Sequence, residues 1–256
     1  MSLAIPQIPS SPGSLWTGSA IVVALLAMPV VLTSLAIRLV ISVIIWRQIS
    51  KGLPVALPHR ATMIEMAFGF YSVINWIAVF AAWRWSARRG FAREVFAFRR
   101  LTWVDAAIAA GGFFAAFYGA PLVTHWAGSL IGGGVPNRSL NMHHAPLMAL
   151  SVFSLLVTAP IAEEVLFRGL LIAWLRRLGW PIWIIWLVGS LAFASIHLRL
   201  YGPVWTTTMV FFGAMILAIR LWRNSLTPGW LIHLLFNARY SVIVPLAMLL
   251  SCSLGG

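Results

Sequence analysis

The stretch PIAEEVLFRGLL, Pro160–Leu171, decides how this chain must fold. It lies inside a long apolar run, yet it carries two adjacent carboxylates, Glu163 and Glu164. A charged side chain at the centre of a lipid bilayer costs about 2.5–3.5 kcal/mol on insertion scales. Two such charges are tolerated only where they face protein or water. We therefore expect this run to be a helix that turns its glutamates into a hydrated cavity inside a membrane protein.

The composition around this stretch is that of an integral membrane protein. Hydrophobic residues make up 61% of the chain and charged residues 9%, whereas soluble domains have about 45–50% and 25%. Apolar runs of about 18 residues or more recur along the chain, and each is a candidate membrane-spanning helix. The sequence predicts an all-α fold, a polytopic transmembrane bundle of about seven helices, formed as one integral-membrane domain over residues 1–256.

The expected helices follow the apolar runs and their punctuation by Gly, Pro and charged residues. Their approximate bounds are Ser19–Trp46, Ala61–Trp83, Leu101–Trp126, Ala145–Arg177, Pro181–Leu198, Val204–Trp222 and Gly229–Leu250. The loops after the second, fourth and sixth helices carry ten arginines, and the other loops carry five basic residues, three of them in the first loop. Because basic loops stay in the cytoplasm, we expect a cytoplasmic N-terminus and an external C-terminus. The membrane expected for this protein is a bacterial cytoplasmic (inner) membrane.

The formal net charge of +13 also raises the question of nucleic-acid binding. The basic residues cluster between apolar runs, where cytoplasmic loops of membrane proteins collect Lys and Arg. The partner expected from this charge pattern is therefore the lipid bilayer, with no nucleic acid.

Polar residues in the second half of the chain recur at helical spacing. Glu164 and Arg168 are four residues apart and share a helix face, while Glu163 projects about 100° away. The segment FASIH gives His197 the same spacing from Phe193. The segment HLLFN does the same for His233 and Asn237. These groups can point into the bundle together, either as a functional cluster or as polar contacts that hold the helices to one another.

As a functional cluster, this set contains the groups that water-mediated hydrolysis requires. A glutamate can take a proton from water and a histidine can share that work, while a second histidine and an amide can donate to an oxyanion. Zinc held by Glu163, His197 and His233 is an alternative, since these are zinc-ligand types. The HExxH, GxSG and GxGD motifs of other intramembrane proteases are absent, and Asp105 is the only aspartate.

Three motifs in order, EEVLFR, FASIH and HLLFN, resemble the CPBP family of CAAX proteases and bacteriocin-processing enzymes, also called the Abi family. The run SLTPGWLIHLLFN is similar to the family's approach to its last motif. The resemblance covers about Ala145–Val242, the CPBP-like catalytic core, and leaves the first three helices without a matching motif.

The resemblance implies a glutamic intramembrane endopeptidase that needs no cofactor and cleaves a membrane-associated protein or peptide. Glu163 would activate water together with His197. His233 and Asn237 would line the oxyanion site. Glu164 and Arg168 would orient Glu163 and hold the cavity.

Two other functions fit a polytopic bundle with inward-facing charges. A non-catalytic bacteriocin-immunity or scaffold protein of the same fold would be favoured by the loss of a signature residue, and the signature positions are intact. A transporter would be expected to show broken helices or an internal repeat, and the sequence shows neither.

Overall fold

The computed structural model describes residues 12–133 and 145–239, and in these ranges it contains helices and no strand. Three parts of the prediction lie outside the described residues: the end of the helix expected over Gly229–Leu250, the end of the core at Val242, and most of the loop before Ala145. Six described stretches are long and apolar enough to cross a membrane. They confirm the all-α, multi-pass fold. Their bounds are Ser14–Ser50, Thr62–Arg88, Trp103–Ile131, Ala149–Arg177, Ile182–Arg199 and Tyr201–Arg223.

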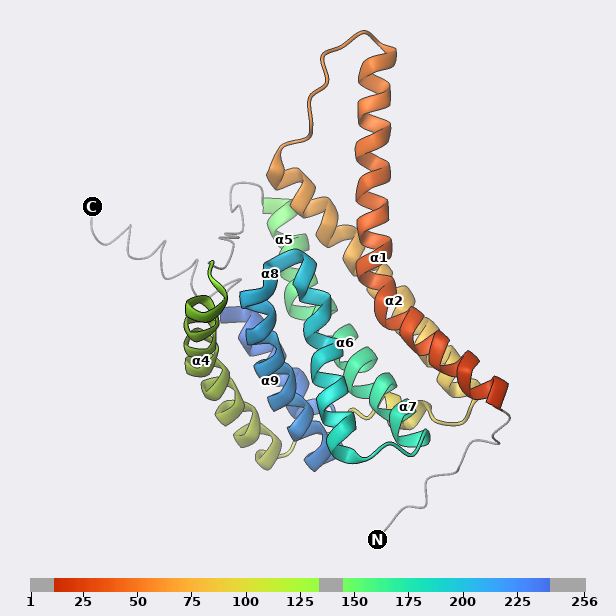
Figure 1. The fold of residues 1–256 in the computed structure, drawn as a ribbon, viewed down its shortest axis with the longest axis vertical. Helices are drawn as coiled ribbons and strands as arrows, with labels where there is room; N and C mark the ends of the chain where they lie inside the picture. The colour runs from red at the N-terminus through yellow and green to blue at the C-terminus, as the bar shows by residue number, and fades with distance from the viewer. Residues whose placement is uncertain (1–11, 134–144, 240–256) are drawn as a thin grey trace, which may run out of the picture.

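The helices form a bundle around one central helix (Figure 1). The outer and N-terminal elements are α1 (Pro12–Ser50), α2 (Arg60–Arg88), the short α3 (Ala92–Val95) and α4 (Trp103–Ile131). The C-terminal elements are α8 (Ile182–Arg223) and α9 (Thr227–Ala238). Helix α1 packs mainly on α2, and α4 packs on α8 and α9.

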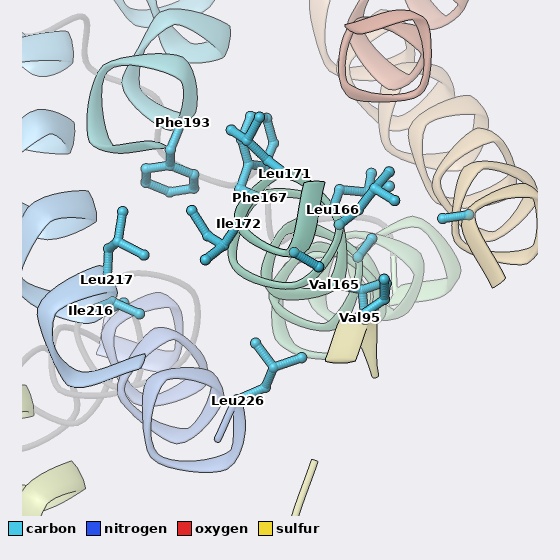
Figure 2. Close-up of a cluster of buried hydrophobic side chains, with 14 of the residues drawn as sticks. Val95, Val165, Leu166, Phe167, Leu171, Ile172, Phe193, Ile216, Leu217 and Leu226 are labelled. Atoms are coloured by element: carbon cyan, nitrogen blue, oxygen red, sulfur yellow. The ribbon is translucent and has the colours of Figure 1, made fainter. Parts of the chain in front are cut away.

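The central helix runs continuously from Ala145 to Arg177, the bounds expected from the sequence. It consists of α5 (Ala145–Phe153), η1 (Ser154–Thr158), α6 (Ala159–Glu163), η2 (Glu164–Leu171) and α7 (Ile172–Arg177), of which η1 and η2 are π-helical. Apolar side chains surround it: Figure 2 shows Val165, Leu166 and Ile172 of this helix among side chains from other elements, including Val95, Phe193, Leu217 and Leu226. The two glutamates therefore sit on the most enclosed helix of the bundle.

Helix α8 contains the two helices expected over Pro181–Leu198 and Val204–Trp222. No loop separates them. The chain reverses at Gly202, whose φ of 79° and ψ of 175° break the helix, and Pro203 follows directly. A side chain would be strained at this φ, so glycine is required here. The two halves pack as an antiparallel hairpin, in which the Trp186 indole donates to the Ala214 carbonyl at 2.9 Å.

The arginine-rich loops meet at one end of the bundle. Arg177 pairs with Glu94, and Arg223 pairs with Asp105 at 3.0 Å. The grouping of these loops on one side agrees with the predicted orientation, although which side of the membrane they face stays a prediction. Several of the ten arginines counted with these loops lie inside helices instead, and one of them, Arg220, is buried within α8.

Candidate active site

The central helix carries the predicted site residues beside two π-helical segments, in which side chains from other helices donate to backbone carbonyls. In η1, the Ala159 N–H donates to the Ser154 carbonyl, five residues back. Pro160 has no N–H with which to continue this register to Leu155. The Leu155 carbonyl instead accepts a hydrogen bond from Nδ2 of Asn237 on α9, at 2.9 Å. Asn237 thus fixes α9 against the central helix.

A second side chain, that of Arg220, donates a hydrogen bond to the backbone of the central helix after the glutamates. In η2, the Arg168 carbonyl accepts a hydrogen bond from Nε of Arg220 at 3.2 Å. The same guanidinium donates to the Glu94 carbonyl at 3.2 Å and to the Asn224 amide oxygen at 2.9 Å. Each π-helical segment is therefore held by a side chain from another helix: η1 by Asn237 and η2 by Arg220. Such π-helical segments are frequent at functional sites.

Glu164 is the centre of a buried charged group. Its Oε1 lies 3.3 Å from Nη1 of Arg168, one turn along the helix, and 3.3 Å from Nδ1 of His233 on α9. The Arg168 guanidinium lies over the Phe193 ring at 3.8 Å from its centroid. Glu164 and Arg168 are 0% and 1% exposed. The structure therefore brings the predicted Glu164–Arg168 pair together and adds His233 to it.

Glu163 approaches the same histidine from the other side. Its Oε2 lies 3.7 Å from Nε2 of His233. This separation is longer than a hydrogen bond. Its Oε1 accepts a hydrogen bond from the hydroxyl of Tyr71 on α2 at 2.8 Å. Oε2 is buried and has no hydrogen-bond partner among the described residues. One oxygen of Glu163 is thus fixed by Tyr71, and the other faces His233 without a hydrogen-bond partner among the described residues.

His197 is half-buried on α8, beside the same aromatic ring. Its Nδ1 lies 3.1 Å from the Phe193 carbonyl. A carbonyl only accepts, so the proton is on Nδ1 and Nε2 keeps its lone pair in the neutral ring. The Phe193 ring centroid is 5.1 Å from that of His197 and 6.0 Å from that of His233. Within the described residues, no hydrogen bond or ion pair joins His197 to Glu163.

The six predicted residues therefore take two arrangements. Glu163, Glu164, Arg168 and His233 form one buried cluster. His197 joins it through Phe193, and Asn237 joins it through the backbone of the central helix. In the ranges that the structure describes, no three His, Cys, Asp or Glu side chains are grouped so that they could hold one metal ion. The side chains named for zinc are not so arranged, and the expectation of no cofactor stays a prediction.

Sequence reasoning missed Tyr71. Tyr71 lies near the middle of the helix expected over Ala61–Trp83, where a hydroxyl requires a partner. That position was the available signal. The partner, 92 residues away, could not be read from the sequence.

Residues 145–239 match the family model described as Type II CAAX prenyl endopeptidase Rce1-like. This match confirms the resemblance to the CPBP family. It contains all six predicted site residues and supports a CAAX-protease-like peptidase with several membrane-spanning helices. No curated protein and no solved structure matches the chain. The match leaves out α1, α2 and α4, and with them Tyr71.

Proposed function

We propose that this chain is a glutamic intramembrane endopeptidase of a bacterial cytoplasmic membrane. It hydrolyses a peptide bond of a membrane-associated protein or peptide, and Glu163 is the base that activates water. One observation carries this proposal: Oε2 of Glu163 is buried beside His233 without a hydrogen-bond partner among the described residues, while Oε1 is held by Tyr71. A general base must reach the proton that it abstracts, and Oε2 is the oxygen that a water molecule can meet.

The charges of the cluster supply both a base and an acid. Glu163 and Glu164 together with Arg168 carry a net charge of one negative unit when all are ionised. Nε2 of His233 lies 3.7 Å from Oε2 of Glu163, a separation that can tighten to a hydrogen bond when a substrate binds. We therefore assign His233 as the acid beside the base Glu163.

The reaction then proceeds in two proton transfers. Glu163 takes a proton from water through Oε2 as the water oxygen attacks the scissile carbonyl, and the lone pair on Nε2 of His197 accepts a hydrogen bond from the same water. Protonated His233 donates a hydrogen bond from Nε2 to the developing oxyanion, while its Nδ1–H still donates to Oε1 of Glu164. The amide of Asn237 is the second donor. The proton on Glu163 finally passes to the leaving amine, which completes hydrolysis.

We propose that this chemistry needs no metal. Within residues 12–133 and 145–239, no three His, Cys, Asp or Glu side chains are grouped so that they could hold one ion. Activity should persist after chelator treatment of the purified protein. Two results would contradict this claim: zinc that copurifies in a stoichiometric amount, or a zinc ion bound about 2.0–2.2 Å from His197, His233 and a carboxylate.

The test is cleavage of peptides by the purified protein in detergent. The substrates are a prenylated CAAX peptide, a leader peptide and a membrane-anchored peptide. Glu163→Gln keeps the volume of the side chain and removes the base, so the rate should fall at least about 10²-fold. The matched control is Glu65→Gln, which changes a buried glutamate of α2 that has no ion pair or hydrogen bond with Glu163; it should cleave at the wild-type rate.

Two results would reject the proposal. A folded Glu163→Gln protein that cleaves at the wild-type rate would show that this glutamate is not the base. Wild-type protein that cleaves none of the peptides would favour the non-catalytic immunity or scaffold function.

A further inference from the structure

A residue outside the family match touches the proposed base. Tyr71 lies on α2, which the match over residues 145–239 does not include. Its hydroxyl donates to Oε1 of Glu163 at 2.8 Å. Hydrogen bonds to ionised acceptors are short and strong. This bond is a direct link between the N-terminal helices and the glutamate that the reaction uses.

We propose that Tyr71 is a positioning residue that fixes the Glu163 carboxylate and thereby selects which oxygen meets water. The inference rests on the proposed function. The two oxygens of Glu163 are chemically equivalent until something distinguishes them. The phenol occupies Oε1, so Oε2 remains for the proton transfer on the side of His233. Without the phenol, the carboxylate can rotate, and the productive geometry is populated for less of the time.

Tyr71 can do this because α2 is fixed to the central helix on both sides of it. On one side, Ser154 Oγ donates to the Phe68 carbonyl at 3.5 Å. On the other side, the rings of Trp85 and Trp174 are 5.3 Å apart. Within α2, Nδ2 of the fully buried Asn75 donates to the Tyr71 carbonyl at 2.8 Å. A functional side chain is most precise when its scaffold is packed in this way.

The charged and titratable groups around Glu163 come from four elements. Tyr71 lies on α2, His233 on α9 and His197 on α8, and Glu164 and Arg168 belong to η2. Of these, Tyr71 is the group that donates a hydrogen bond directly to Glu163 within the described residues. Its removal should therefore change how the rate depends on pH, because a donor to a carboxylate favours the charged form.

The experiment compares Tyr71→Phe with Tyr118→Phe, a change of an exposed tyrosine on α4. We expect kcat of Tyr71→Phe to fall about 10-fold, the effect of one hydrogen bond to a charged group, with KM unchanged. The acidic limb of its pH–rate profile should move to higher pH, since the carboxylate loses a donor that favours its ionised form. Tyr118→Phe should match the wild type in both measurements.

A fluorinated tyrosine at position 71 keeps the ring and the hydroxyl and makes the hydroxyl a stronger donor. It should move the acidic limb in the opposite direction, so the inference can be tested even if Tyr71→Phe folds poorly. A kcat and a pH profile of Tyr71→Phe equal to those of Tyr118→Phe would overturn the inference. A lower kcat with an unchanged pH profile would assign Tyr71 a purely structural role and would also overturn it.

The two proposals fail in different ways. If Glu163→Gln is inactive and Tyr71→Phe behaves as wild type, the inference fails and the proposed function stands. If Glu163→Gln cleaves at the wild-type rate, both fail.

Discussion

The central helix and α1 are both apolar enough to cross a membrane, yet their surroundings are opposite. In an 18-residue apolar stretch of the central helix, 61% of the residues are buried inside the protein, and in the corresponding stretch of α1 the share is 11%. Helix α1 exposes large apolar side chains along its length, and its C-terminal end extends beyond the other helices (Figure 1). Hydrophobicity places both helices in the membrane. The buried charges, Glu163, Glu164 and Arg168, distinguish the helix that other helices must enclose.

The variant with the largest expected loss of stability is Glu164→Gln on the central helix. It removes the charge that faces Arg168 and His233 and leaves a cation enclosed by protein. Breaking one partner of a buried ion pair costs about 3–5 kcal/mol of stability. We expect a loss of this size in thermal or denaturant unfolding of the detergent-solubilised protein.

The same variant separates the two glutamates in activity. Glu164 positions Arg168 and does not take the proton, so correctly folded Glu164→Gln should keep more activity than Glu163→Gln. A folded Glu164→Gln protein without activity, beside a Glu163→Gln protein that cleaves normally, would reverse the assignment of the base.

The next effect concerns close packing of the central helix. A Cβ at Gly169 would collide with the carbonyl oxygen of Val95, a backbone atom that cannot rotate away. Gly169→Ala should therefore destabilise the protein by about 3 kcal/mol, the upper part of the range for overpacking. The control is Gly111→Ala on α4, where nothing lies within 4 Å of the added carbon. It should stabilise the helix by up to about 1 kcal/mol. Equal unfolding temperatures for the two variants would contradict the close approach.

A smaller loss of stability should follow from removing the hydrogen bond that Asn237 donates to the Leu155 carbonyl. Asn237→Ala leaves the part-buried Leu155 carbonyl without its donor, which should cost about 1 kcal/mol, the low end of the range for an unsatisfied buried group. Gln48 makes comparable hydrogen bonds to Ala56 at the exposed end of α1. Water replaces such a partner there, so Gln48→Ala should change the free energy of unfolding by less than about 0.5 kcal/mol. Similar losses in both variants would remove the distinction between the enclosed and the exposed helix.

The sequence predicted those features that depend on local pattern. The central helix, the shared face of Glu164 and Arg168, and the two histidine-bearing helices follow from hydrophobic runs and four-residue spacing. The π-helical segments could not be predicted, because they depend on donors from other helices: Asn237 for Leu155 and Arg220 for Arg168. Tyr71 was missed for the same reason. Its role exists only once α2 is packed against the central helix.

The smallest expected effect tests whether α1 faces lipid. Leu39 is 66% exposed, and Leu166 on the central helix is 0% exposed. Leu166→Ala leaves a cavity and should cost about 2–5 kcal/mol. Leu39→Ala should change stability by less than about 0.5 kcal/mol, because lipid tails are as apolar as leucine and fill the space of the missing side chain. The measurement is denaturant unfolding in lipid–detergent mixed micelles, with Leu166→Ala as the reference. If Leu39→Ala destabilises the protein as strongly as Leu166→Ala, then protein rather than lipid covers this face, and α1 is as enclosed in the membrane as the helix that carries the glutamates.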